Sequence, residues 1–184
     1  MVVGNDNAGS RAPRPGERER CLAHPDGASG VPAPSLTEHN ERVRIRPADV
    51  TDAVAVFTLL DQATGGAAPR RSAFDHNYEQ VIAAMTYDGT DFVVADRDGE
   101  VIGYALAARV LSLSANGPVS QLLELVVGAA HRGRGVGALL VDAIIRRARN
   151  AGAVEVTVAA RGARGYFERR GFTETATCLT LPLL

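Results

Sequence analysis

The chain of 184 residues carries 20 basic and 21 acidic residues, a net charge of −1, and 46% hydrophobic residues. This balance is typical of a globular domain and excludes a polycation that binds nucleic acid through its net charge. Every basic residue is arginine, which excludes Schiff-base chemistry at a lysine and the phosphate-binding lysine of a P-loop. No apolar run approaches the roughly 18 residues of a membrane span, so we expect a cytoplasmic protein with no membrane partner.

The first 40 residues differ from the rest of the chain. Residues 1–40 hold five of the nine prolines and few large apolar side chains. Such a segment cannot offset the entropy cost of ordering by burial, so we expect a flexible leader. Hydrophobic periodicity begins at residue 41, and we expect one domain over residues 41–184.

The first half of this domain predicts a strand, two helices and a hairpin. Residues 42–48 alternate as a strand does, and residues 49–63 follow the capping residues Asp49 and Thr51 with apolar residues at helical spacing. Residues 72–86 indicate a second helix. Residues 91–113 form two β-rich runs around Asp98-Gly99, a strong hairpin turn.

The second half alternates strands and helices. Residues 121–127 (QLLELVV) indicate a buried strand, 134–150 an amphipathic helix, and 153–160 a further strand. A short helix at 163–170 and a closing strand at 172–183 complete the order. The whole pattern predicts a mixed α/β fold in one domain.

The segment HRGRGVG, residues 131–137, places three glycines at alternate positions where a strand passes into a helix. Free N–H groups and the positive end of the helix dipole meet there, and glycine lets a large anion approach them closely. Arg132 and Arg134 add full positive charges suited to phosphate geometry. The loop therefore predicts a pyrophosphate site.

A dinucleotide site is an alternative for this loop. GRGVGA fits the pattern G-x-G-x-x-A, and Glu155 follows about 20 residues after the central glycine. A dinucleotide loop follows its strand almost directly, however, whereas GAAHR stands here between Val127 and Gly133. We therefore rank this alternative lower.

The segment LELVVGAAHRGRGVGALL resembles the acyl-CoA-binding motif of the GNAT superfamily of N-acetyltransferases. Arg132, Gly135 and Gly137 match its pattern [Q/R]-x-x-G-x-[G/A], and YFERRGF at 166–172 resembles its second marker. The resemblance covers residues 42–182. It implies a mostly antiparallel sheet with a splayed parallel pair of strands, flanked by helices, and acetyl transfer from acetyl-CoA to a primary amine by direct attack in a ternary complex.

The resemblance also implies where the cofactor would lie. The backbone of the splayed strand would pair with the pantetheine arm, and the glycine loop would hold the pyrophosphate, with His131 at its rim. The implied cofactor-binding residues are Leu125, Val126, Val127, Arg132, Gly133, Arg134, Gly135, Val136 and Gly137. The two cysteines and four histidines show no metal-binding spacing, so we expect no metal.

Two side chains are candidates for proton transfer. Glu124 is the acid within an apolar strand and is our first candidate base, although a strand carboxylate that faces solvent or pairs with an arginine is an equal alternative. Glu155 is the second candidate. Tyr166 is the candidate acid, but many family members carry tyrosine one position later, where this chain has Phe167. A helix turns about 100° per residue, so this shift puts the role of Tyr166 in doubt.

Three questions stay open at this point. A non-catalytic acyl-CoA-binding module is the main alternative to an enzyme. The acceptor amine is not specified by residues 61–75 or 112–119, which hold no sharp motif. The apolar end LTLPLL offers a strand that could pair across a homodimer.

Overall fold

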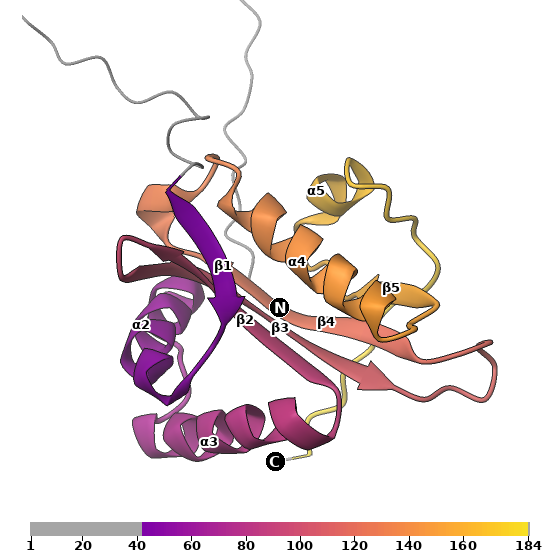
Figure 1. Cartoon of the computed structure of the whole chain (residues 1–184), viewed down its shortest axis with the longest axis horizontal. Coiled ribbons are helices and arrows are strands. Elements are labelled where there is room, and N and C mark those ends of the chain that lie inside the picture. The colour runs from indigo at the N-terminus through magenta and orange to yellow at the C-terminus, as the bar shows by residue number, and fades with distance from the viewer. Residues whose placement is uncertain (1–41, 184) are drawn as a thin grey trace, which may run out of the picture.

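The computed structural model describes residues 42–183 as a sheet between two layers of helices (Figure 1). Helices α2 (Ala53–Thr64) and α3 (Arg71–Tyr87) cover one face of the sheet. Helices α4 (Val136–Asn150) and α5 (Arg164–Glu168) cover the other. The leader expected at residues 1–40 lies outside the described residues.

Five strands form the sheet, in the order β1-β2-β3-β4-β5. They are β1 (Val43–Pro47), β2 (Thr90–Arg97), β3 (Glu100–Val110), β4 (Val119–Val127) and β5 (Glu155–Val158). Neighbouring strands are antiparallel except β4 and β5, which run parallel. The fold class predicted from the sequence, a mostly antiparallel sheet with one parallel pair, is confirmed.

Local sequence accounts for the main turns. Asp98 and Gly99 have φ angles of 55° and 88°, the left-handed pair that a type I′ hairpin turn requires. Asp49 begins a short 3-10 turn, Val50–Asp52, in which the Asp49 and Asp52 carboxylates each accept a hydrogen bond from the other end of the turn. This turn leads directly into α2, close to the helix start that the capping residues predict.

The two faces of the sheet bury separate cores. The core beneath α4 includes Val93, Leu125, Leu140 and Phe167. The core beneath α2 and α3 contains a row of aromatic rings in successive contact, with centroids 5.0 to 5.9 Å apart. In order, the row runs Phe57, Phe74, Tyr78, Phe92, Tyr104.

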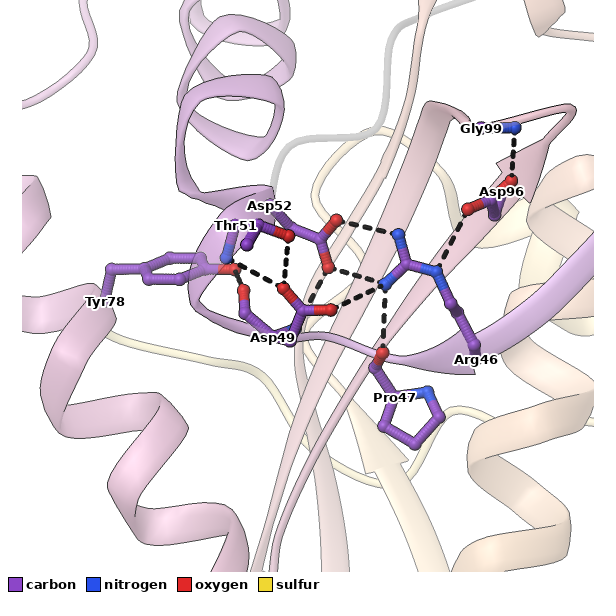
Figure 2. A network of polar contacts seen from close by, with 8 residues as sticks. All are labelled: Arg46, Pro47, Asp49, Thr51, Asp52, Tyr78, Asp96 and Gly99. Carbon is purple, nitrogen blue, oxygen red and sulfur yellow. Dashed lines mark hydrogen bonds and ion pairs between the residues drawn. The ribbon is translucent and has the colours of Figure 1, made fainter.

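Arg46 on β1 joins three parts of the chain through its guanidinium (Figure 2). It binds both oxygens of the Asp52 carboxylate, at 2.7 and 2.8 Å, and one oxygen of Asp96, at 3.0 Å. Asp52 is only 4% exposed. The hydrogen bond with Asp52 is the largest cause that raises the pKa of Arg46 above its usual value, so this cation stays charged. Arg46 therefore fixes the start of α2 to the β2–β3 hairpin.

The closing strand predicted at residues 172–183 is wrong. No regular secondary structure follows Gly171 in the described chain, and Leu179, Leu181 and Leu183 are each more than 80% exposed. Arg161 contacts Thr180, and Arg164 contacts Glu174, but these are side-chain contacts. A strand needs a neighbour that pairs with its backbone, and local alternation alone does not supply one.

Within residues 42–183, none of the helices has the length and apolar character that crossing a bilayer requires.

Candidate active site

The parallel strands β4 and β5 pair over only part of their length. Their register runs from Val119 opposite Glu155 to Leu122 opposite Val158. Beyond Leu122, β4 continues for five residues, to Val127, without pairing to β5. The predicted splay is therefore present, and it leaves one side of the second half of β4 open.

The open side presents backbone groups of Leu125 and Val127. The Gly128 N–H donates to the carbonyl of Ile102 on β3 at 2.9 Å, so the backbone at this position points toward β3. In an antiparallel pair, adjacent residues point their N–H and C=O groups to opposite sides. The backbone groups of Val127 and Leu125 therefore point away from β3, into the splay, whereas those of Val126 point toward β3. Arg132 supports this direction because its Nε donates to the Val127 carbonyl at 3.1 Å.

The glycine loop opens directly onto the N-terminus of α4. Gly133 and Gly135 have φ angles of 70° and 85°, which L side chains rarely adopt. Gly135 is the N-cap of α4 and supplies no side chain to the first turn. The first N–H groups of a helix lack partners within it, so Val136, Gly137 and Ala138 present theirs to the loop. With Arg134 exposed beside them, these groups fit an anion such as a pyrophosphate.

His131, the predicted rim residue, lines a cavity of about 800 Å³ between α2, the β2–β3 turn and the start of the loop. Arg46 also lines it, but Asp52 and Asp96 already occupy its guanidinium. The anion-binding geometry lies at the loop itself.

A β-bulge determines where Glu124 points. Leu106 on β3 pairs with Glu124, and the next residue, Ala107, pairs with Leu122, so Leu123 has no counterpart. Strict alternation would place residues 122, 124 and 126 on one face of the sheet. The bulge breaks this pattern. Leu122 and Leu125 both pack into the core beneath α4, while Glu124 is turned to the face of α2 and α3.

Glu124 is half-buried, and its Oε2 accepts a hydrogen bond of 2.8 Å from the hydroxyl of Tyr104. The structure therefore pairs Glu124 with a tyrosine on the neighbouring strand, and part of the half-buried side chain still faces solvent. Burial and the Glu124 charge raise the pKa of Tyr104 far above its usual value, so the hydroxyl stays protonated and donates. No pattern along the chain indicates Tyr104 as this partner, because the contact depends on strand register and on the bulge.

The Tyr166 hydroxyl is buried beside the N-terminus of α4. A Cβ added to Gly137 would lie 3.0 Å from the Tyr166 Oη and 3.7 Å from a methyl of Val127, so the hydroxyl lies near both. No residue among 42–183 makes a well-aligned hydrogen bond with it, although Arg170 lies close enough to interact with the hydroxyl. Burial raises the pKa of Tyr166, against the opposing effect of Arg170, whose guanidinium lies 5.5 Å from the ring centroid. A buried hydroxyl without a well-aligned partner can bind a ligand atom at this position.

Phe167 fills the core beneath α4 and is 2% exposed. Glu155, the second candidate base, is exposed at the start of β5, opposite Val119, at the far end of the strand pair from the splay. Asp142 binds Arg170 at 2.9 Å on the outer side of α4. The structure thus places Glu124 and Tyr166 next to the open half of β4, on opposite faces of the sheet, and leaves Glu155 away from it.

Within residues 42–183, no three histidine, cysteine, aspartate or glutamate side chains form a group that could hold a metal ion.

Comparison with known proteins agrees with this geometry. The model of the Acetyltransferase (GNAT) family matches residues 54–172. The chain is 28% identical over 141 residues to glucosamine 6-phosphate N-acetyltransferase 1 of Oryza sativa subsp. japonica. The aligned region covers 73% of this chain and 83% of that protein.

Two solved structures share the fold. The glucosamine-6-phosphate N-acetyltransferase of Arabidopsis thaliana is 18% identical, with a TM-score of 0.66 over 77% of this chain and 98% of that one. The aminoglycoside N-acetyltransferase AAC(6')-Iy in complex with CoA is 24% identical, with a TM-score of 0.62 over 76% of this chain and 93% of that one. The family match covers most of the chain and includes Glu124, the glycine loop and Tyr166. The chain therefore belongs to the acetyltransferase (GNAT) family and is an acetyl-CoA-dependent acyltransferase.

Proposed function

We propose that this protein transfers an acetyl group from acetyl-CoA to a primary amine by direct attack, with both substrates bound at once. The observation that carries the proposal is the open half of β4. It has the glycine loop at its end, a tyrosine hydroxyl on one face and a carboxylate on the other. Two substrates can then approach the same strand from opposite sides.

The cofactor would lie on the side of α4. The loop from Arg132 to Gly137 and the first N–H groups of α4 would hold its pyrophosphate. The open N–H groups of Leu125 and Val127 would pair with its arm, and an N–H aimed at the thioester oxygen would polarise the carbonyl. Acetyl-CoA itself supplies an activated acyl group whose leaving group is a thiolate. Val136 is buried beneath the loop and supports it by packing.

Glu124 is the proposed base. An alkyl amine has a pKa of about 10.4, so it must lose a proton before its nitrogen can attack. The Glu124 carboxylate lies on the face opposite the glycine loop and would take that proton, directly or through a water molecule.

Tyr166 is the proposed acid. Its hydroxyl is buried next to Val127 and the first turn of α4. Burial raises its pKa, so the hydroxyl is protonated at neutral pH and would donate to the sulfur as negative charge develops there. Phe167, at the position where many family members have tyrosine, is enclosed in the core and does not compete for this role.

The first experiment tests the cofactor. Thermal unfolding is followed with acetyl-CoA, CoA, NAD and ATP in parallel, and a ligand at 100 times its Kd adds about 2.7 kcal/mol of stability. We expect a shift with acetyl-CoA and CoA alone. A shift with NAD but not with CoA would overturn the proposal.

The second experiment tests the chemistry by thiol release from acetyl-CoA. The amine panel contains glucosamine 6-phosphate, an aminoglycoside, a polyamine, an amino acid and a peptide with a free N-terminus. We expect Glu124→Gln and Tyr166→Phe to retain the thermal shift with CoA but to lower kcat by about 10²- to 10⁴-fold. Release that depends on no amine would overturn the reaction, and full activity in either variant would overturn that residue's role.

A further inference from the structure

The Glu124 carboxylate is held by a side chain that the proposed mechanism does not yet use. Glu124 has two carboxylate oxygens, and the Tyr104 hydroxyl donates to Oε2 at 2.8 Å. A base within a protein site works well only when its accepting oxygen is held in a productive position. The contact leaves Oε1 for the incoming amine.

Tyr104 is itself rigidly placed. Its side chain is 1% exposed on β3, and its ring meets that of Phe92 edge-to-face, with centroids 5.9 Å apart. Phe92 in turn meets Tyr78, the middle of the aromatic row, at 5.6 Å. A hydroxyl mounted on such a packed ring has little freedom to rotate away, because buried side chains occupy fixed rotamers.

The bulge completes the arrangement. The register pairs Leu106 with Glu124 and Tyr104 with Val126, so Tyr104 is the diagonal neighbour of Glu124 on the face of α2 and α3. Diagonal neighbours on one face of an antiparallel pair lie within reach of a long aromatic side chain. The bulge at Leu123 thus turns the Glu124 carboxylate to the face that holds Tyr104, and the tyrosine ring is long enough for its hydroxyl to reach Oε2.

We infer that Tyr104 is a positioning residue for acetyl transfer, which binds Glu124 Oε2 and thereby directs Oε1 toward the amine proton. The inference rests on the proposed function. In the step itself Glu124 takes a proton from the ammonium, and the freed lone pair of the nitrogen forms the bond to the acetyl carbon. The carbon–sulfur bond breaks with its electron pair on sulfur, which takes a proton from Tyr166, and Tyr166 regains a proton from the acylated nitrogen through solvent. Tyr104 keeps its own proton throughout, because burial holds its pKa far above neutrality.

Tyr78 provides a matched control. It lies in the same aromatic row, is 6% exposed, and donates its hydroxyl to the backbone carbonyl of Asp49 at 2.6 Å. Tyr78→Phe and Tyr104→Phe each remove one buried hydroxyl and keep the ring. The two variants therefore share a structural cost, but only Tyr104→Phe releases Glu124.

The test measures kcat and KM for both variants with the amine of highest turnover. A urea titration at the assay temperature first shows that both variants are folded in the absence of urea. We expect Tyr104→Phe to lower kcat about tenfold, the effect of one lost hydrogen bond to a charged group, with the KM for acetyl-CoA within about twofold of the wild type. Tyr78→Phe should stay within about twofold in both constants. Equal losses in the two variants would show a structural role only and overturn the inference.

A double-mutant cycle separates this inference from the proposed function. In a Glu124→Ala background, Tyr104→Phe should cause no further loss of kcat beyond about twofold, because its target is gone. A tenfold loss that persists there would mean that Tyr104 acts by another route. If Glu124→Ala alone leaves kcat unchanged, the proposed base is wrong and the inference falls with it. If Glu124→Ala is impaired while Tyr104→Phe is fully active, only the inference is wrong.

Discussion

Asp52 is a buried carboxylate, and within residues 42–183 the one cation that forms an ion pair with it is Arg46 (Figure 2). Replacing Arg46 by methionine removes this cation. The change deletes two hydrogen bonds to Asp52, at 2.7 and 2.8 Å, and one to Asp96, at 3.0 Å. It leaves Asp52 4% exposed, with the Asp49 N–H as its remaining donor. Methionine fills the space of the arginine stem, so the loss is mainly electrostatic.

The expected cost follows from this burial. Breaking a buried ion pair by removing one partner costs about 3–5 kcal/mol. The Arg46 side chain is 21% exposed and Asp52 keeps one donor, so we expect the lower end, about 3 kcal/mol. With an m-value of about 2 kcal/mol per molar urea, the unfolding midpoint should fall by about 1.5 M.

Two comparisons test the reasoning. Arg71→Met breaks the pair with Asp75, whose side chains are 46% and 43% exposed, and should cost less than about 1 kcal/mol. Adding Asp52→Asn to Arg46→Met should recover more than half of the loss, because the uncompensated charge disappears. Equal midpoints for Arg46→Met and Arg71→Met would refute the argument that Asp52 is a charge buried at high cost.

Three further predictions concern the glycines and the response to acid. Gly103→Ala should lower the free energy of unfolding by about 1–3 kcal/mol in urea titration, because its Cβ would lie 2.8 Å from the backbone oxygen of Val126; an unchanged midpoint would contradict this. Gly135→Ala should cost about 1–2 kcal/mol because of its φ of 85°, and calorimetry should show weaker acetyl-CoA binding; unaltered affinity would remove Gly135 from the site. The pKa of Asp49 is lowered chiefly by the Thr51 hydroxyl, and the pKa of Asp96 chiefly by the Gly99 N–H. As the pH falls, these two carboxylates are therefore protonated in the unfolded chain before they are protonated in the folded protein. The stability that these groups contribute is therefore complete above about pH 4 and is lost as the pH falls below it, which urea midpoints between pH 6 and 3 would show; an Asp49→Asn/Asp96→Asn variant should lose less over that range.

Local chemistry made much of the fold predictable. The Asp98-Gly99 turn, the capping residues before α2 and the glycines before α4 each act within a few residues, and each occurs where the sequence places it. The splay of β4 and β5 could not be predicted from local sequence, because the point after Leu122 and Val158 where pairing stops depends on both strands together. Only the resemblance to a family implied it.

Features that depend on register escaped prediction. The pattern QLLELVV shows no sign that Leu123 is an extra residue, yet this residue decides which face Glu124 occupies. The Tyr104 contact joins positions 20 residues apart and follows from that same bulge. The error at residues 172–183 has the opposite cause, since alternation there suggested a strand that no neighbouring backbone completes.

The open half of β4 also gives this protein an unpaired strand edge in its interior rather than at its rim. Edges of this kind recruit any extended chain that can reach them, and proteins usually blunt them with charge, proline or a covering loop. Here the amides of Leu125 and Val127 face the gap beside β5, so we expect them to exchange with deuterium faster than that of Val126. The proposed cofactor site predicts that added acetyl-CoA protects them. The proposed cofactor site thus also predicts that acetyl-CoA covers a strand edge that could otherwise pair with another chain.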